Sequence, residues 1–122
     1  RKLILLNIVK SCGEISEKGI SLLISLLKDE KNIDLHYTIY KLGGRTIVKE
    51  LQEDLKALLY LGLIEVNPKN KKLRLTSSGQ EFLSSLSVQI EKIDEILSAV
   101  EELKPRILPI DEEVSLLAVT KR

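Results

Sequence analysis

The sequence predicts an α+β domain that is mainly helical, and three features of its 122 residues support this fold class. Apolar residues make up 43% of the chain but aromatic ones only 3%, so the core is aliphatic and suits packed helices. Most apolar stretches have a helical period, whereas residues 63–75 have the alternation of a β-hairpin. The length suits one domain with its own core.

Two helices are predicted in the first thirty residues. The first runs from Arg1 to about Ser11, and Ile15 then forms a single-residue strand pairing. Ser16 is a suitable N-cap for the second helix, which extends to about Lys28. Because this helix is apolar on most sides, we expect it to be the most buried one.

A third helix is predicted after a less regular stretch. Residues 35–40 alternate between apolar and polar side chains, which fits either a short strand or an extended packed segment. The glycine pair 43–44 breaks the chain, and Thr46 can cap a helix from about Ile47 to Leu61. Apolar residues at spacings of three and four make this the clearest amphipathic helix of the chain.

The C-terminal part is predicted to form a long helix. Thr76 caps it after the hairpin, and Pro105 stops it after Lys104. Apolar residues follow one another at spacings of 3, 4, 3, 4 and 3, which is typical of a coiled coil: Leu83, Leu86, Ile90, Ile93, Leu97 and Val100. This stripe needs a partner, either a second chain or the body of its own domain.

A second chain is favoured as that partner, because the stripe continues past the point where it can still reach the body. The predicted dimer interface comprises Leu86, Ile90, Ile93, Leu97 and Val100. The expected organisation is therefore a domain at 1–80, a dimerisation helix at 81–104 and a tail at 105–122.

Two segments resemble the winged helix-turn-helix superfamily. They are Leu55–Glu65, with the sequence LKALLYLGLIE, and Leu73–Gly79, LRLTSSG, after which Phe82 and Leu83 complete the pattern. The resemblance covers roughly residues 3–86 and implies a reading helix followed by a two-stranded wing. The long C-terminal helix is similar to the dimerisation helices of small archaeal and bacterial transcriptional regulators.

A fainter likeness, at residues 40–46, is to Panacea-type antitoxin domains, which carry an insert before the third helix. The match is partial, because no proline follows the glycine here. We take from it only the suggestion of an insert.

The resemblance and the charge distribution together predict a homodimeric regulator that binds double-stranded DNA. Residues 1–75 hold 14 Lys and Arg against 9 Asp and Glu, whereas residues 76–122 hold 5 against 9. The third helix is expected to enter the major groove and the basic wing to contact phosphates. The expected DNA-binding residues are Arg45, Thr46, Lys49, Gln52 and Lys56 at the helix, and Lys69, Lys71, Lys72 and Arg74 in the wing.

One observation leaves an alternative open. Glu50, Glu53 and Asp54 fall on the same third helix, and carboxylates that face phosphate are unfavourable. The helix surface is then simply solvated, with Glu and Lys paired along it. In that case the chain is a winged-helix protein-interaction module, a subunit of a larger assembly or an antitoxin-like adaptor, without DNA binding.

Other classes of function find little support. The sequence offers no glycine-rich phosphate loop and no Cys/His set with metal spacing, so we expect no enzyme, no cofactor and no metal. Cys12 is interpreted as a small buried hydrophobe and His36 as a surface residue. We also expect no membrane segment and a cytoplasmic location.

Overall fold

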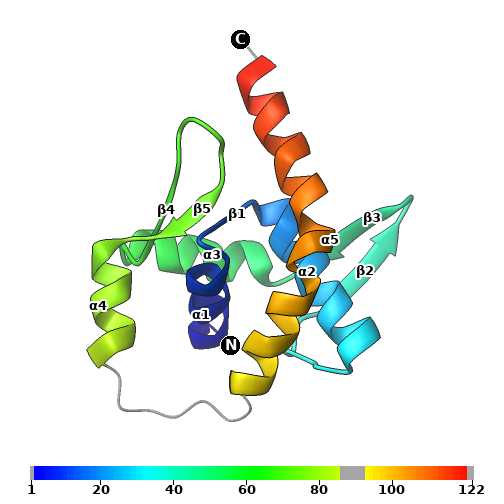
Figure 1. Cartoon of the computed structure of the whole chain (residues 1–122), viewed down its shortest axis with the longest axis horizontal. Helices are drawn as coiled ribbons and strands as arrows, with labels where there is room; N and C mark the ends of the chain where they lie inside the picture. Colours follow the sequence, from blue (N-terminus) through cyan, green and yellow to red (C-terminus); the bar gives the residue numbers. More distant parts are fainter. Residues whose placement is uncertain (1, 86–92, 121–122) are drawn as a thin grey trace.

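The computed structural model describes residues 2–85 and 93–120, with side chains up to Pro109 in the second range. It confirms an α+β fold that is mainly helical (Figure 1). The helices are α1 Lys2–Cys12, α2 Glu17–Lys31, α3 Leu51–Tyr60, α4 Ser77–Ser85 and α5 Ile93–Thr120. The strands are β1 Glu14–Ile15, β2 Ile39–Leu42, β3 Arg45–Val48, β4 Ile64–Val66 and β5 Leu73–Leu75.

Three strands form an antiparallel sheet in the order β1-β5-β4. Ile15 lies opposite Leu73, and Ile64 lies opposite Leu75. The predicted β-hairpin and the predicted strand pairing of Ile15 are therefore both confirmed. Ile15, Ile64 and Leu73 are buried, so this small sheet closes one side of the core.

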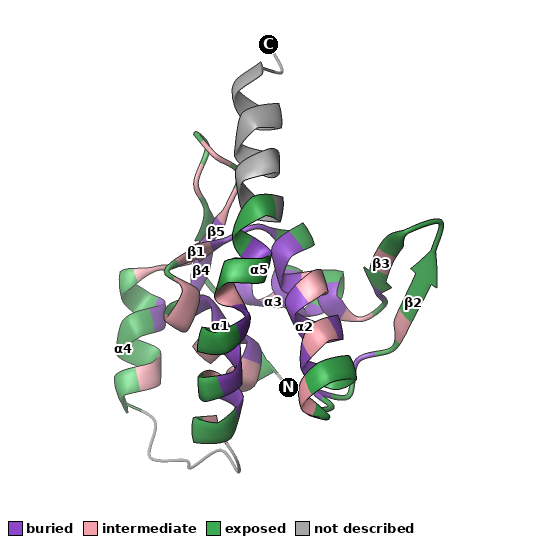
Figure 2. Ribbon diagram, turned by 45° about the vertical axis from the view of Figure 1, so that its right-hand side comes forward, coloured by how far each residue is buried: buried purple, intermediate pink, exposed green. Residues whose placement is uncertain are grey.

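Helices α1, α2 and α5 pack together around the aliphatic core (Figure 2). The predicted N-cap of α2 is confirmed, because the Ser16 hydroxyl accepts a hydrogen bond from the Gly19 amide at 2.9 Å. The helix continues past the predicted Lys28 to Lys31, where Asn32 adopts a left-handed conformation and ends it.

The region before α3 differs from the prediction, because β2 and β3 form a separate two-stranded hairpin there. Gly43 and Gly44, with φ of 54° and 79°, occupy the two-residue turn. Two successive residues of positive φ match the right-handed twist of the flanking strands, which is why a glycine pair favours such a tight turn.

Arg45, Thr46 and Ile47 consequently lie on strand β3 and not on the third helix, which begins only at Leu51. The prediction of a helix from Ile47, capped by Thr46, is wrong. The apolar spacing misled it: Ile47 and Val48 continue the period of α3, yet they sit opposite Tyr40 and Ile39 in the hairpin. β-branched residues at these positions suit the strand.

The C-terminal helix also differs from the prediction. Helix α4 ends at Ser85 and α5 begins at Ile93, so the structure describes two helices where one was expected. Leu86 and Ile90 of the predicted dimer interface lie outside the described residues. The predicted stop at Pro105 is wrong, because α5 runs through Pro105 and Pro109.

The position of these prolines explains why α5 continues. A proline in a helix frees the carbonyl four residues earlier, here those of Glu101 and Pro105. Glu101, Pro105 and Pro109 are all exposed, so water can reach the freed carbonyls. The prolines thus lie on the solvent side, where they are least disruptive.

Helix α5 packs on its own chain, along α2 and α1. Its buried face consists of Ile96, Ala99, Val100, Leu103 and Ile107. Val100 is 0% exposed, so its assignment to a dimer interface is wrong, because the body of its own domain covers it. Ile93 and Leu97 are half-buried.

Polar contacts at the margins complete this packing. Lys31 pairs with Glu102, and Arg106 pairs with Glu30. The Lys104 ammonium donates to the carbonyl of Ser11 at 2.6 Å, which ties α5 to the end of α1. These contacts join α5 to both of the N-terminal helices.

Gly79 in the first turns of α4 yields a first prediction. Thr76 caps this helix by accepting from the Gly79 amide at 3.0 Å, and this draws Gly79 against the β-sheet. A Cβ at Gly79 would collide with the carbonyl oxygen of Leu63 and press on the Leu75 side chain. We expect Gly79→Ala to lower the free energy of unfolding by roughly 2–3 kcal/mol in urea denaturation.

The matched control for that variant is the neighbouring exposed Ser78. Ser78→Ala is expected to change the free energy of unfolding by less than about 0.5 kcal/mol. Equal effects of the two variants would contradict the close contact at Gly79.

Candidate nucleic-acid interface

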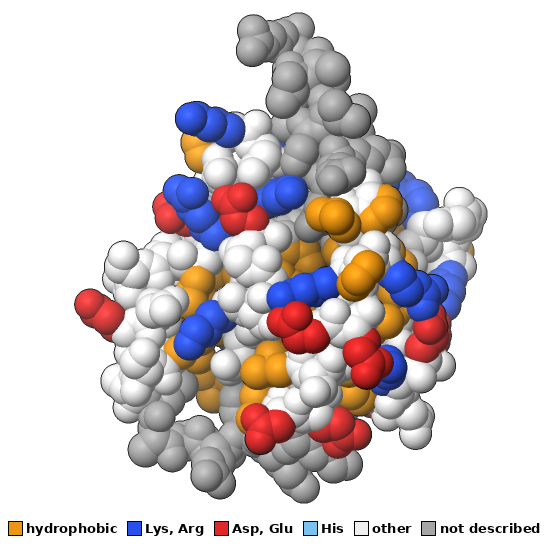
Figure 3. All heavy atoms as spheres, in the orientation of Figure 1, with side chains coloured by type: hydrophobic (Ala, Val, Ile, Leu, Met, Phe, Trp, Pro, Cys, Tyr) orange, Lys and Arg blue, Asp and Glu red, His pale blue; other side chains and the backbone are white. Residues whose placement is uncertain are grey.

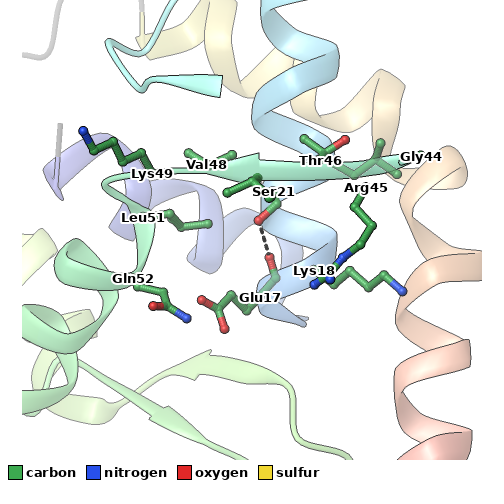
Figure 4. Close-up of a pocket in the computed structure, with 12 residues that line it drawn as sticks. Glu17, Lys18, Ser21, Gly44, Arg45, Thr46, Val48, Lys49, Leu51 and Gln52 are labelled. Carbon is green, nitrogen blue, oxygen red and sulfur yellow. Dashed lines mark hydrogen bonds between the residues drawn. The ribbon is translucent and has the colours of Figure 1, made fainter. Parts of the chain in front are cut away.

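A groove of about 820 Å³ lies between β3, the first half of α2 and the start of α3 (Figure 4). It has an apolar floor that includes Leu22, Val48 and Leu51. Its polar lining residues are Glu17, Lys18, Ser21, Arg45, Thr46, Lys49 and Gln52. We call these seven residues and their floor the β3 groove.

The β3 groove unites residues that the sequence analysis had placed on one helix. Arg45, Thr46, Lys49 and Gln52 all line it, although only Gln52 belongs to α3. Arg45 lies at the hairpin end of β3 and Lys49 just past its other end (Figure 4). The predicted residues are therefore close in space, but the elements that carry three of them differ from the prediction.

The groove is electropositive. Lys18, Arg45 and Lys49 are exposed, and they make no ion pair with any residue in the described ranges 2–85 and 93–109. One acid, Glu17, also lines the groove, and its carboxylate faces the side-chain amide of Gln52 (Figure 4). Three cations against one carboxylate attract an anion, and unpaired cations are the ones that can release counterions on binding.

Two of the three carboxylates of the third-helix region are turned away from the β3 groove. Glu50 accepts hydrogen bonds from the backbone amide of Thr38 at 2.7 Å and from its hydroxyl at 2.8 Å. Asp54 is only 2% exposed and accepts a hydrogen bond from the Tyr37 hydroxyl at 2.7 Å. Only Glu53 remains as an exposed acid on this helix. The main electrostatic objection to a DNA-facing α3 is thereby much reduced.

The same two hydrogen-bonded acids position the β2–β3 hairpin. Glu50 and Asp54 lie four residues apart, so they project from one side of α3. Both bind the segment Tyr37–Thr38 that leads directly into β2. They therefore fix the base of the hairpin relative to the start of α3.

The turn of the β4–β5 hairpin carries a second group of cations. Lys69 and Lys71 are exposed and Lys72 is half-buried, and none forms an ion pair with a residue that the structure describes. The turn is ordered by two asparagines, since Asn67 accepts from the Lys69 amide and Asn70 from the Lys72 amide, each at 3.0 Å. The three lysines thus project from a turn that hydrogen bonds hold in place.

Arg74, by contrast, is engaged within the sheet. Its guanidinium pairs with Glu65 at 3.0 Å and lies 3.8 Å from Glu14. A hydrogen bond from Asn67 lowers the pKa of the Glu14 carboxyl below its usual value, with Asn70 and the charge of Arg74 adding to the effect. Arg74 therefore belongs to the base of the hairpin, and we omit it from the proposed DNA contacts.

Strand β1 connects the two groups of cations. Glu14 on β1 accepts hydrogen bonds from Asn67 at 2.9 Å and Asn70 at 3.2 Å in the β4–β5 turn. Three residues later, Glu17 lines the β3 groove at the start of α2. The turn and the groove are thus joined by a short segment of chain.

The surface over α5 is of mixed charge. In Figure 3, acidic side chains lie over the lower part of the face, with Lys and Arg side chains among them, and cations lie at the tip of the β4–β5 turn. The exposed acids of this helix include Asp94, Glu95, Glu101 and Glu102, of which Glu101 pairs with Lys104 and Glu102 with Lys31.

The sequence analysis missed Lys18 and Ser21, which line the groove from α2. No local pattern marked them, because their place depends on the packing of α2 against β3, which is distant in sequence. Lys56 is exposed one turn after Gln52 on α3 but does not line the groove.

Comparison with protein-family models, with curated proteins and with solved structures found no match to this chain. Within the part of the chain that the structure describes, three or more His, Cys, Asp or Glu never gather as metal ligands would. None of the described helices combines the length and the apolar character needed to cross a membrane. The geometry of the two basic groups is therefore the feature of the molecule that bears on function.

Proposed function

We propose that this chain is a winged-helix protein that binds double-stranded DNA and acts as a transcriptional regulator. The observation that carries the proposal is the β3 groove, where three exposed cations without ion partners in the described chain meet the first turn of α3. The hydrogen-bonded carboxylates of Glu50 and Asp54 support it, because neither lines the groove, where three cations face the single carboxylate of Glu17.

The element order supports a winged-helix mode of binding. The β1-β5-β4 sheet follows α3 with a basic hairpin, as expected for a wing. In this mode α3 enters the major groove, where Gln52 is placed to recognise adenine and Lys56 to approach a phosphate. Lys18, Arg45 and Lys49 contact the flanking backbone, and the wing cations Lys69, Lys71 and Lys72 add further phosphate contacts.

The proposed regulator is a homodimer, joined through α5. Val100 is excluded from the interface, but Ile93 and Leu97 are half-exposed and Leu108 is 53% exposed. Helical spacing places these three along one edge of the buried face of α5. A second α5 packed there would bring two reading helices to a palindromic site.

Fluorescence anisotropy with duplex DNA of mixed sequence tests the proposal. We expect binding at low salt that weakens steeply as salt is raised, because most of the affinity comes from phosphate contacts. A triple variant in which glutamine replaces Lys69, Lys71 and Lys72 should reduce the slope of log K against log salt by about 2–3. Gln52→Ala should leave that slope unchanged and alter sequence preference only.

Absence of binding at low salt would contradict the proposal. The protein-interaction module would then be the better interpretation, and the exposed Tyr60 and Leu61 at the end of α3 would be the surface to examine first.

A further inference from the structure

The β2–β3 hairpin is an exposed feature with no role in the core beyond its base (Figure 1, Figure 2). One of its faces turns to α2: Val48 there is buried, and the Lys41 ammonium pairs with Asp29 of that helix at 2.5 Å. Residues two apart on a strand share a face. Tyr40 and Leu42 on β2 therefore lie on the other face, together with Arg45 and Ile47 of β3, which at its edge also line the β3 groove.

That outer face is unusually apolar for a solvent-exposed ribbon. Tyr40 is 47% exposed, Leu42 63% and Ile47 38%. Tyr40 and Ile47 are cross-strand partners, and Leu42 lies opposite Arg45 next to the turn. Large apolar side chains gathered on an exposed edge indicate a contact surface.

The charge of the hairpin identifies its partner as an anion. Residues 39–49 contain Lys41, Arg45 and Lys49 and no acid. The wing segment 67–74 has the same property, with three lysines, one arginine and no acid. A protein partner matched to the apolar face alone would not need this complete exclusion of acids, whereas a phosphate backbone does.

The two acid-free hairpins adjoin opposite ends of α3 in the sequence. The β2–β3 hairpin ends three residues before α3 begins, and the wing starts four residues after α3 ends. A helix of 10 residues is about 15 Å long. The DNA major groove is about 12 Å wide. With α3 in that groove, the hairpins next to its two ends would reach the flanking backbone on either side.

The tip of the β2–β3 hairpin is narrow. Gly43 and Gly44 form it without side chains, and a Cβ at either would meet open space. The DNA minor groove is about 6 Å wide and admits slender elements. Proteins that bind there use arginine against the negative potential and apolar side chains against the sugars and base steps. Arg45 and Leu42 lie on either side of the glycine turn, so the hairpin carries one arginine and one apolar side chain next to its tip.

We propose that the β2–β3 hairpin is a second DNA-binding arm, which places Arg45 and Leu42 in the minor groove that flanks the site of α3. The inference rests on the proposed function and extends it. Because A·T-rich tracts narrow the minor groove and deepen its negative potential, the arm selects A·T-rich flanks. This preference arises outside the bases that α3 contacts.

The test compares Arg45→Gln with Lys41→Gln. Both variants remove one positive charge from the same hairpin, but Lys41 is on the α2 face and already paired with Asp29. Anisotropy is measured on duplexes that share a random core and carry either A·T-rich or G·C-rich flanks. We expect Arg45→Gln to lower the affinity about tenfold and to reduce the slope of log K against log salt by about 1. The variant should also lose the preference for A·T-rich flanks. Lys41→Gln should keep the preference.

A further variant, Leu42→Ser, removes an exposed apolar side chain without a change in charge and should weaken the flank preference at an unaltered salt slope. Thermal denaturation of each variant checks that the fold is retained. Wild-type binding that Arg45→Gln leaves unchanged, or that Lys41→Gln weakens equally, would overturn the second arm and leave the proposed function standing. Failure of the wild type to bind any duplex would overturn both.

Discussion

Reversal of the three groove cations, Lys18, Arg45 and Lys49→Glu, is expected to abolish measurable DNA binding. All three side chains are exposed and have no ion partner in the described chain, so their replacement breaks no ion pair there. Each reversal removes one of the proposed phosphate contacts and adds a repulsive carboxylate to the groove that Glu17 already lines. We expect the affinity for mixed-sequence duplex to fall by more than about 100-fold, measured by anisotropy at low salt.

A control with the same change in net charge separates the groove from the charge of the whole molecule. Lys2, Lys10 and Lys28 are also exposed, and none of them lines the β3 groove. Their joint replacement with glutamate should weaken binding far less, since long-range attraction alone is screened by salt. If the two triple variants lost affinity equally, binding would be a matter of net charge and the groove would not be the site.

The parts of the fold that the sequence predicted depend on local signals. The alternation of Lys72, Leu73, Arg74 and Leu75 determines strand β5, and the hydroxyl of Ser16 determines the start of α2. These residues adopt the structure that their neighbours in sequence favour. Local consistency of this kind is what makes an element predictable.

The β2–β3 hairpin is a region where two local sequence signals predict different structures. Gly43-Gly44 between alternating residues is a recognised hairpin signal, and it was available in the sequence. The helical spacing from Ile47 to Leu51 conflicts with that signal, because it predicts that the helix already begins at Ile47. The structure satisfies both, because Val48 is buried as the strand ends and Leu51 is buried as the helix begins.

The β3 groove and the packing of α5 depend on contacts between distant residues. Lys18 and Arg45 line the same groove only because β3 packs across α2. The inward turn of Asp54 depends on Tyr37, which is 17 residues away. Neither relation leaves a periodic trace in the sequence, so the site could be predicted as a set of residue types but not as an arrangement.

The coiled-coil prediction was wrong for Val100, because two periods are similar over a short helix. The spacing of 3.5 residues that runs through Ile93, Leu97 and Val100 drifts by only about 20° per heptad from the period of a straight helix. The buried face of α5 is instead centred between Ile96 and Leu103. Val100 belongs both to the predicted coiled-coil stripe and to the buried face. Because it is covered by its own domain, it is assigned to the buried face.

Substitution of that residue, Val100→Asp, is expected to destabilise the domain severely. Val100 is 0% exposed and lies on the face of α5 that packs against α1 and α2. A carboxylate there would be buried without a partner and would cost roughly 4 kcal/mol or more. A domain of this size has a total stability of about 5–15 kcal/mol, so the substitution removes a large share of it. Circular dichroism and thermal denaturation should show a strongly lowered melting temperature at any protein concentration.

The matched variant Leu97→Asp gives the contrast. Leu97 is half-buried three residues earlier on the same helix, so the domain should remain folded with a modest loss of stability. If α5 joins two chains, this variant should also shift the mass measured by light scattering from dimer to monomer. A Val100→Asp protein that stayed folded and became monomeric would reverse the conclusion, because Val100 would then face a second chain and α5 would leave its own domain in the dimer.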